Sequence, residues 1–389
     1  MGALSLARRR QSGLAFSWGA PFFQIRDLCE RRGVAVFFSN FQLYGDMSGR
    51  IMQVLTERAG EIEIYSIDEA FLFFPKQMDL QHIVGDCSEI RSLVKRLVGI
   101  PTSIGIGPTK TLAKVAGDLA KKDPTGVVEL ATPSRRQAVL ETLPVKEVWG
   151  IGTRLEKRLH GLGIRTGAEL CASAPSVVRK QLGVVGERIL YELQGISCLL
   201  SGEIQPKKTI TRSRSFGKMV TDLSELAQAL STHVASAARV LREEDSCAKA
   251  LCAFADIMID PKTNSRQCVS AMATFAVPTN DTPFLIGAAK DCLLQIWTEG
   301  HRYKKCGIIL LDLVPQSSIA PDLFSNHPNE TDQKRRRLAS VVDGLNDRFG
   351  KGSVIYGAMG VKAPWQARAC HSSSRFSTNW DELPIVYAH

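Results

Sequence analysis

The stretch EIEIYSIDEAFLFF, residues 61–74, places two adjacent carboxylates, Asp68 and Glu69, between two apolar runs. In a straight strand their side chains would face opposite ways, so a shared site requires a tight turn or a bulge at this point. The apolar flanks predict that the pair is buried, and burying two uncompensated charges costs several kcal/mol each. A divalent metal ion would stabilise such a cluster. A solvated Asp-Glu pair without a function is the plainer alternative.

A basic helix is predicted in GIGPTKTLAKVAGDLAKK, residues 105–122. At about 100° per residue, Lys110, Lys114, Gly117 and Lys121 share one basic, partly bare face, and the apolar residues lie nearly opposite. The Gly-Ile-Gly that precedes the helix lets the backbone approach closely. Lysines on a helix face are most often only solvated. Because the preceding strand could lie beside the carboxylates, a phosphate and metal site is the alternative prediction.

The third pattern, VWGIGTRLEKRL at residues 148–159, is typical of a helix-hairpin-helix. Its Gly150-Ile151-Gly152 turn can offer backbone N–H groups to a DNA phosphate, with Arg154, Lys157 and Arg158 nearby. A plain turn is the alternative reading. A nuclease or glycosylase built on such a hairpin is disfavoured, because those chemistries need a different acidic or lysine arrangement near the hairpin.

The order of the predicted elements divides the chain into parts. Apolar strands alternate with helical patterns to about residue 130, which predicts a catalytic domain of mixed helices and strands. Residues 131–200 read as short helices broken by Gly and Pro, and the polar, basic residues 201–208 read as a linker. A βαββαβ-like order follows at 209–314. Residues at helical spacing then predict one more amphipathic helix, through Leu338, Val341, Val342, Leu345 and Phe349.

Composition narrows the class of protein. The chain has 389 residues, a net charge of +10 and ten cysteines without a C-x-x-C pair. The positive charge favours a polyanionic partner, although a merely soluble basic protein is the alternative. The cysteines indicate neither a disulfide framework nor a zinc knuckle and fit a reducing, cytoplasmic location. No apolar run approaches the roughly 18 residues that a membrane helix needs, so no membrane partner is expected.

Six segments follow one another along the chain: LYGDMSGRIMQVL, EIYSIDEAFL, GIGPTKTLAKVAGDLAKK, VWGIGTRLEKRL, RSRSFG and GHRYKKCGIILLD. In this order they resemble the motifs of Y-family translesion DNA polymerases, and most closely those of the UmuC-type catalytic subunit of bacterial DNA polymerase V. The resemblance implies an α+β, right-hand polymerase fold. Its expected parts are a remnant of the fingers (1–39), a palm (40–130), a helical thumb with the helix-hairpin-helix (131–200), a linker (201–208), a little finger (209–314) and a C-terminal tail with a clamp-like loop and a partner-binding helix (315–389).

The resemblance also implies a function, error-prone translesion DNA synthesis in the SOS response, by template-directed nucleotidyl transfer. Asp68 and Glu69 match the palm's catalytic, metal-binding carboxylates, where Mg²⁺ ions activate the primer 3′-hydroxyl and neutralise the triphosphate. Lys121 matches a lysine that contacts the nucleotide triphosphate. The expected DNA contacts are Gly150, Gly152, Arg154, Lys157, Arg158, Lys207, Lys208, Arg212 and Arg214.

Family members carry a further metal-binding Asp on a first strand, and this chain is expected to begin after that strand. The alternative prediction is therefore a catalytically dead DNA-binding fragment. The implied partners are damaged primer-template DNA, a deoxynucleoside triphosphate, a UmuD-type accessory subunit, RecA and, weakly, a sliding clamp. The clamp contact is expected at Leu323 and Phe324.

Overall fold

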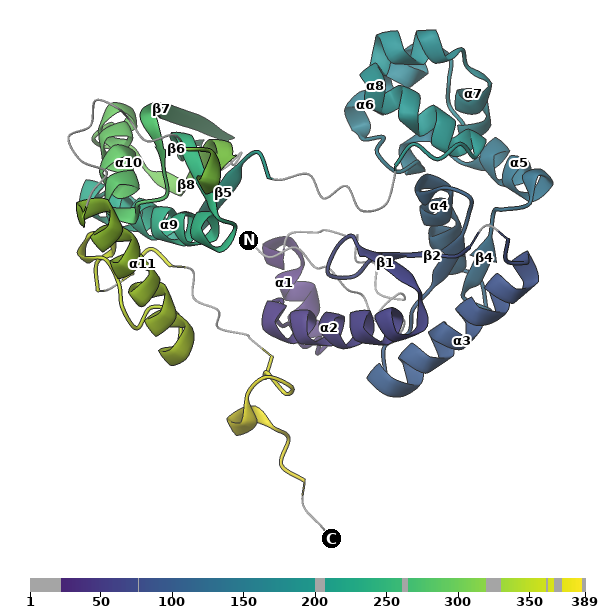
Figure 1. The fold of residues 1–389 in the computed structure, drawn as a ribbon, viewed down its shortest axis with the longest axis horizontal. Helices are drawn as coiled ribbons and strands as arrows, with labels where there is room; N and C mark the ends of the chain where they lie inside the picture. The colour runs from purple at the N-terminus through teal and green to yellow at the C-terminus, as the bar shows by residue number, and fades with distance from the viewer. Residues whose placement is uncertain are drawn as a thin grey trace. The chain divides into compact units, whose positions relative to one another are not determined.

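The computed structural model of the chain describes residues 22–75, 77–199, 207–260, 265–319, 330–361, 363–366 and 373–386. The chain folds into two compact units (Figure 1). The first comprises Met1–Ile204 with His371–His389, and the second comprises Gln205–Cys370. Both units mix helices with strands, so the predicted α+β class is confirmed.

The first part of the first unit holds two short two-stranded sheets and the helices around them. β1 pairs with β2 as an antiparallel hairpin, from Glu61 opposite Phe73 to Ile64 opposite Ala70. β3 pairs with β4 in parallel. In chain order the elements are α1 (Phe22–Arg31), α2 (Phe41–Arg58), β1 (Glu61–Ile64), β2 (Ala70–Phe73), α3 (Leu80–Val98), β3 (Ile104–Ile106), α4 (Lys110–Ala120) and β4 (Val127–Glu129).

Helix α4 lies directly against β3 because Gly105 has no side chain. A Cβ at Gly105 would lie 2.0 Å from the backbone nitrogen of Gly117 and 2.1 Å from the carbonyl oxygen of Ala113. Thr109 caps the helix, since its side chain accepts a hydrogen bond from the N–H of Leu112. The close approach expected of the Gly-Ile-Gly backbone is therefore present.

The next part of the first unit is built from helices, as the sequence predicts, although the last of them spans 20 residues with a break at Gly183. The buried side chain of Glu192 joins the last of them to α4, because its carboxylate accepts a hydrogen bond from the N–H of Thr111 at 3.1 Å. These helices are α5 (Pro133–Thr142), the 3₁₀ helix η2 (Val145–Glu147), α6 (Thr153–Gly161), α7 (Gly167–Ala172) and α8 (Pro175–Gln194).

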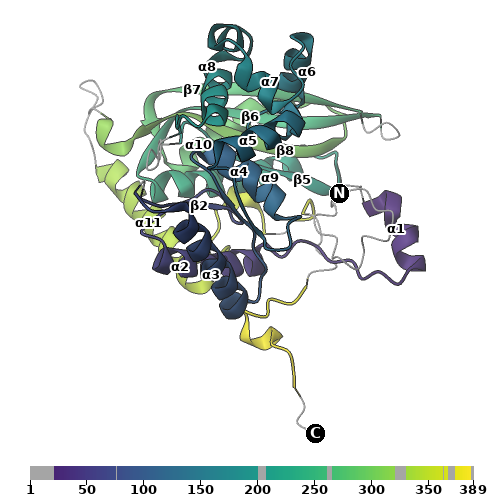
Figure 2. The same cartoon turned by 90° about the vertical axis from the view of Figure 1, so that its right-hand side faces the viewer.

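The second unit is a four-stranded antiparallel sheet in the order β5-β8-β6-β7, whose long strands run side by side (Figure 2). α9 and α10 pack on the sheet and on each other around one apolar core. The predicted βαββαβ-like order is confirmed. The elements are β5 (Ile210–Val220), α9 (Leu223–Glu243), β6 (Ser246–Asp260), β7 (Ser265–Thr279), α10 (Thr282–Ile296), β8 (Tyr303–Pro315) and η3 (Gln316–Ser318).

The C-terminal part of the chain is divided between the two units. In the second unit, α11 (Glu330–Phe349) is held on α9 by the ion pair of Arg242 with Asp343 at 2.7 Å. η4 (Gly357–Met359) follows, and Trp365, 1% exposed, closes the core. In the first unit, the Asn40 side chain donates to the carbonyl of Ser373 at 3.1 Å. The tail that the sequence presents as one part, 315–389, thus contributes to both units, with η5 (Trp380–Glu382) in the first.

Three predicted features fall wholly or partly outside the described residues. They are residues 1–21 of the expected fingers remnant, residues 201–206 of the linker, and the clamp-like loop with Leu323 and Phe324. Within the described ranges, no helix combines the length and apolar character needed to cross a membrane. Each cysteine that the structure describes is a free thiol.

Candidate active site

Asp68 and Glu69 lie in the turn that joins β1 to β2. The N–H groups of Tyr65 and Ser66 both donate to the carbonyl oxygen of Glu69, each at 3.0 Å, and close the turn. The Asp68 Oδ1 atom accepts a hydrogen bond from the Ser66 hydroxyl at 2.7 Å. The turn that a shared site requires is therefore present in the chain.

The prediction that these carboxylates are buried is wrong. Asp68 is exposed and Glu69 is half-buried, while the neighbouring Ile64 and Ile67 are 59% and 49% exposed. The reason is that β1 and β2 have four residues each and, among the described residues, pair only with each other. The short hairpin therefore leaves its apolar side chains partly in solvent, and desolvation alone does not demand a metal ion.

The basic face predicted on α4 is covered at Lys110 and Lys114, because these two lysines face the hairpin formed by β1 and β2. The Lys110 Nζ atom lies 2.7 Å from an oxygen of Glu63, and the Lys114 Nζ atom lies 2.8 Å from Glu69 Oε2. Lys110 is only 9% exposed and lies against two aromatic rings of β2. Two acidic side chains of the hairpin thus compensate two lysines of the helix.

Lys121, the predicted triphosphate contact, lies at the C-terminal end of α4. Its Nζ atom pairs with Asp118 at 2.7 Å, and its side chain is 64% exposed. The hydrogen bond to Asp118 raises the pKa of Lys121, partly offset by burial, and the charges of Asp118, Glu69 and Asp68 raise it further. Lys121 is therefore a cation within the field of the carboxylate turn.

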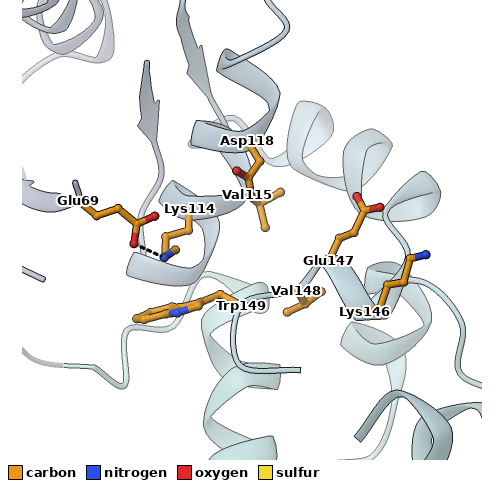
Figure 3. A pocket seen from close by; sticks show the side chains of 8 residues that line it. All are labelled: Glu69, Lys114, Val115, Asp118, Lys146, Glu147, Val148 and Trp149. Carbon is orange, nitrogen blue, oxygen red and sulfur yellow. Dashed lines mark hydrogen bonds and ion pairs between the residues drawn. The ribbon is translucent and has the colours of Figure 1, made fainter. Parts of the chain in front are cut away.

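A hollow of about 280 Å³ opens beside Glu69. Figure 3 shows Glu69 and Lys114 pointing toward each other, with the ring of Trp149 close by. Sequence reasoning placed Lys114 on the candidate basic face but missed Trp149 as a member of this site. The signal that could have found Trp149 is its position directly before the Gly150 turn. The lining residues are Glu69, Lys114, Val115, Asp118, Lys146, Glu147, Val148 and Trp149.

The chemistry of the donors fits a divalent cation that is shared with a substrate. Asp68 and Glu69 offer two carboxylates at an exposed turn, and Mg²⁺ is usually held by one or two carboxylates together with substrate phosphates. Within the described part of the chain, no group of three or more His, Cys, Asp or Glu side chains could hold a metal ion. The residues present therefore do not form a closed, all-protein metal site.

The predicted hairpin turn lies just before α6. Gly150 has a φ of +90°, and a Cβ at this position would lie 2.8 Å from Ile189 Cδ1. Gly152 precedes the first turn of α6 and provides no side-chain cap, so the first N–H groups of α6 can face an anion. Arg154 and Lys157 are exposed on the same helix. This arrangement suits a phosphate.

The remaining predicted DNA contacts have local partners or are exposed. Arg158, on α6, donates to the carbonyl of Gln181 at 3.2 Å. In the second unit, Lys207 forms an ion pair with Glu244, and Arg212 Nε donates to the Ser236 hydroxyl at 3.3 Å. Two further basic residues of the second unit are exposed, Lys208 and Arg214.

Four family models match successive parts of the chain. The impB/mucB/samB family matches residues 12–118, and the C-terminal domain of that family matches residues 207–323. The helix-hairpin-helix motif of the same family matches residues 133–164. A domain of unknown function, DUF4113, matches residues 336–386.

The chain is similar to whole proteins as well. It is 36% identical to the protein UmuC of Salmonella typhimurium over 97% of this chain and 89% of that protein. It is 28% identical to DNA polymerase IV of Moorella thermoacetica over 92% of this chain and 86% of that protein. A solved Y-family DNA polymerase chimera of Dbh and Dpo4 shares the fold, with a TM-score of 0.60 at 22% identity over 80% of this chain and 88% of the other.

Y-family DNA polymerases generally depend on divalent metal ions, which agrees with the donors in the turn of the hairpin. The match to UmuC covers nearly the whole chain, and the family matches extend over the parts that hold the carboxylates, the hairpin and the second unit. The chain therefore belongs to the impB/mucB/samB family, the UmuC-type Y-family DNA polymerases of translesion synthesis.

Proposed function

We propose that this chain carries out error-prone, template-directed DNA synthesis past damaged bases, with its chemistry at the turn between β1 and β2. The observation that supports this most strongly is the hollow beside Glu69. There the carboxylate turn, the basic helix α4 and the segment before α6 meet within one unit. Two carboxylates next to a turn that would bind a DNA phosphate suit nucleotidyl transfer better than hydrolysis of a base or a strand.

Each residue has a role that follows from its position. Asp68 and Glu69 would hold Mg²⁺ together with oxygens of the incoming triphosphate. When bound, such ions neutralise the triphosphate and activate the primer 3′-hydroxyl. Lys121 would place a positive charge near the same phosphates. The first turn of α6 and the exposed basic residues of the second unit would bind the DNA backbone without reading its sequence.

The experiment is primer extension on an undamaged template and on one with an abasic site. We expect the 389-residue chain to add nucleotides, and a version extended upstream in the genomic reading frame serves as the comparison. The second candidate function is a DNA-binding protein without catalysis. It is favoured by the lack of a three-ligand metal group among the described residues. DNA binding without extension by the 389-residue chain would select this second function.

We also propose that α11 carries the docking surface for a UmuD-type accessory subunit. Leu338, Val341 and Phe349 are 61%, 57% and 63% exposed, whereas Asp343 and Asp347 hold the helix on α9 through arginines. An exposed apolar stripe rimmed by charge is typical of a protein interface. Leu338→Glu should abolish binding to purified UmuD-type dimers, and the exposed Lys351→Glu should not.

The sliding clamp and RecA are proposed as partners from the family resemblance. For the clamp, a peptide spanning residues 316–326 should bind weakly, and its Phe324→Ala variant should not bind, because aromatic anchors carry much of the energy of such contacts. For RecA, the full chain should co-sediment with RecA filaments. Absence of binding in either assay would remove that partner.

A further inference from the structure

Lys114 is held more tightly than a surface lysine. Its ammonium lies 4.9 Å from the ring centroid of Tyr65 and 4.9 Å from that of Trp149. The same ammonium lies 2.8 Å from Glu69 Oε2, and the Lys114 side chain is 21% exposed. A cation with an aromatic face on two sides and a carboxylate at its tip has few alternative positions.

Trp149 connects this cation to the turn before α6, where a phosphate contact is predicted. Its ring packs edge-on against Tyr65 at 5.4 Å and lies 5.9 Å from Phe71. Trp149 directly precedes Gly150, whose φ of +90° shapes the turn before α6. The side chain of Lys114 therefore contacts Glu69, in the turn between β1 and β2, and also the ring of Trp149, which directly precedes the turn before α6.

The lysine one helical turn earlier provides an internal comparison. Lys110 pairs with Glu63 and lies over the rings of Phe71 and Phe73, at 5.4 and 5.6 Å. Its carboxylate partner, however, belongs to strand β1 and not to the turn. The same chemistry at Lys110 therefore fastens α4 to the hairpin, whereas at Lys114 it reaches a predicted catalytic carboxylate.

We propose that Lys114 is a positioning residue. It keeps Glu69 in place while no metal ion is bound, and it links Glu69 to the turn before α6 through Trp149. This rests on the proposed function of the turn between β1 and β2. The Lys114 charge also competes with any divalent ion for the Glu69 oxygen. Removing the charge should therefore have two opposite effects, tighter ion binding by the free protein and poorer placement of Glu69 for catalysis.

The first test measures Mn²⁺ binding to the free, full-length protein by electron paramagnetic resonance. We expect Lys114→Met to tighten the apparent Kd about fivefold, because a unit positive charge a few ångströms away is removed. Lys114→Arg keeps the charge and should stay within about twofold of the wild type. Lys110→Met is the matched control and should also stay within about twofold, since its partner is Glu63. If Lys114→Met does not fold, Lys114→Gln replaces it with the same expected sign.

The second test follows the link to Trp149 by hydrogen exchange. We expect Trp149→Leu to increase exchange of the amides at residues 65–69 by about threefold, because Lys114 loses one aromatic face. Trp380→Leu, at an 87% exposed position, should leave these amides unchanged.

Unchanged or weaker Mn²⁺ binding by the uncharged Lys114 variants would overturn the proposal, as would unchanged exchange in Trp149→Leu. Neither measurement requires nucleotide incorporation. A chain that shows both effects but does not extend primers would therefore refute the proposed function and leave the role of Lys114 standing.

Discussion

The second unit and the β1–β2 hairpin use apolar residues in opposite ways. In the second unit, strands of 11 to 15 residues pack against α9 and α10, and Phe216 and Trp365 are at most 2% exposed. The hairpin strands have four residues each, and Ile64 and Ile67 remain largely exposed. The apolar residues of the second unit are buried in one core and stabilise its fold. The hairpin leaves space around the turn that carries the carboxylates.

The difference predicts where substitutions act. Changes in the core of the second unit should lower stability and leave the chemistry at the turn intact. Changes at the turn should alter chemistry with little effect on stability, because few of its side chains are buried.

The largest effect is expected for Trp365→Ala. Trp365 is 1% exposed and contacts the rings of Phe216 and His233 at centroid distances of 6.1 and 5.9 Å. Removing a buried aromatic side chain of this size lowers the free energy of unfolding by about 3–5 kcal/mol. Chemical denaturation of the full chain measures it. Trp380→Ala, at an 87% exposed site, is the control and should change the stability by less than about 0.5 kcal/mol.

Gly105→Ala should come next, and it acts in the first unit. A Cβ at Gly105 would overlap backbone atoms of α4, so the helix has to shift away from β3. Overpacking of this kind lowers stability by about 1–3 kcal/mol. Gly85→Ala is the matched control, because a Cβ there meets nothing within 4 Å inside α3. It should raise stability by about 0.5–1 kcal/mol. Equal effects of the two variants would contradict the packing described for α4.

Acidification should weaken the second unit through His233. Burial, with a smaller effect of the Arg214 charge, lowers the pKa of His233 to about 4, below its ordinary 6.5. The unfolded chain therefore binds the proton more readily between these values, and stability falls as the pH falls from 6.5 to 4. The loss at pH 4.5 should be about 2.5 kcal/mol. Unfolding curves at pH 7 and 4.5 test this, and His233→Leu should remove that part of the pH dependence.

The smallest effect is expected at the helix-hairpin-helix turn before α6. Arg154 is exposed beside the first turn of α6, so it should contribute one phosphate contact without sequence preference. Arg154→Ala should reduce the slope of log affinity for DNA against log salt by about 1. Titrations at several salt concentrations measure the slope. Lys122 is exposed just after the C-terminal end of α4, and Lys122→Ala serves as the control. An equal change in slope for Lys122→Ala would argue against a DNA contact at the turn before α6.

Local sequence patterns predicted the secondary structure, whereas burial and long-range contacts could not be predicted from them. The helices and the βαββαβ-like order follow from periodicity and from the glycine signals, whereas the turn at Asp68 was expected only because a site shared by Asp68 and Glu69 requires it. The burial of the carboxylates was predicted wrongly, because an apolar run shows that a strand can be covered and not that it is. The contact of Lys114 with Trp149 joins residues 35 positions apart and depends on how α4 meets the helices that follow.

In the C-terminal part, too, the sequence predicted a helix but not what its apolar face contacts. The spacing of Leu338, Val341 and Leu345 predicted an amphipathic helix, and α11 is present. The apolar stripe is exposed, however, and the docking of α11 depends on ion pairs of α9 arginines with Asp343 and Asp347. Helical periodicity identifies a face of a helix, whereas the partner of that face depends on the assembled fold.

We propose that the turn between β1 and β2 is the chemical centre and that DNA is bound by other parts of the chain. The most direct test compares single-nucleotide incorporation and DNA affinity for the wild-type chain and for the Asp68→Asn, Glu69→Gln double variant. Both substitutions preserve side-chain size and remove the charge that a divalent ion requires. We expect incorporation to fall to background in the double variant, while its Kd for primer-template DNA stays within about twofold of the wild-type value. Incorporation that persists at the wild-type rate in the double variant would contradict the proposal.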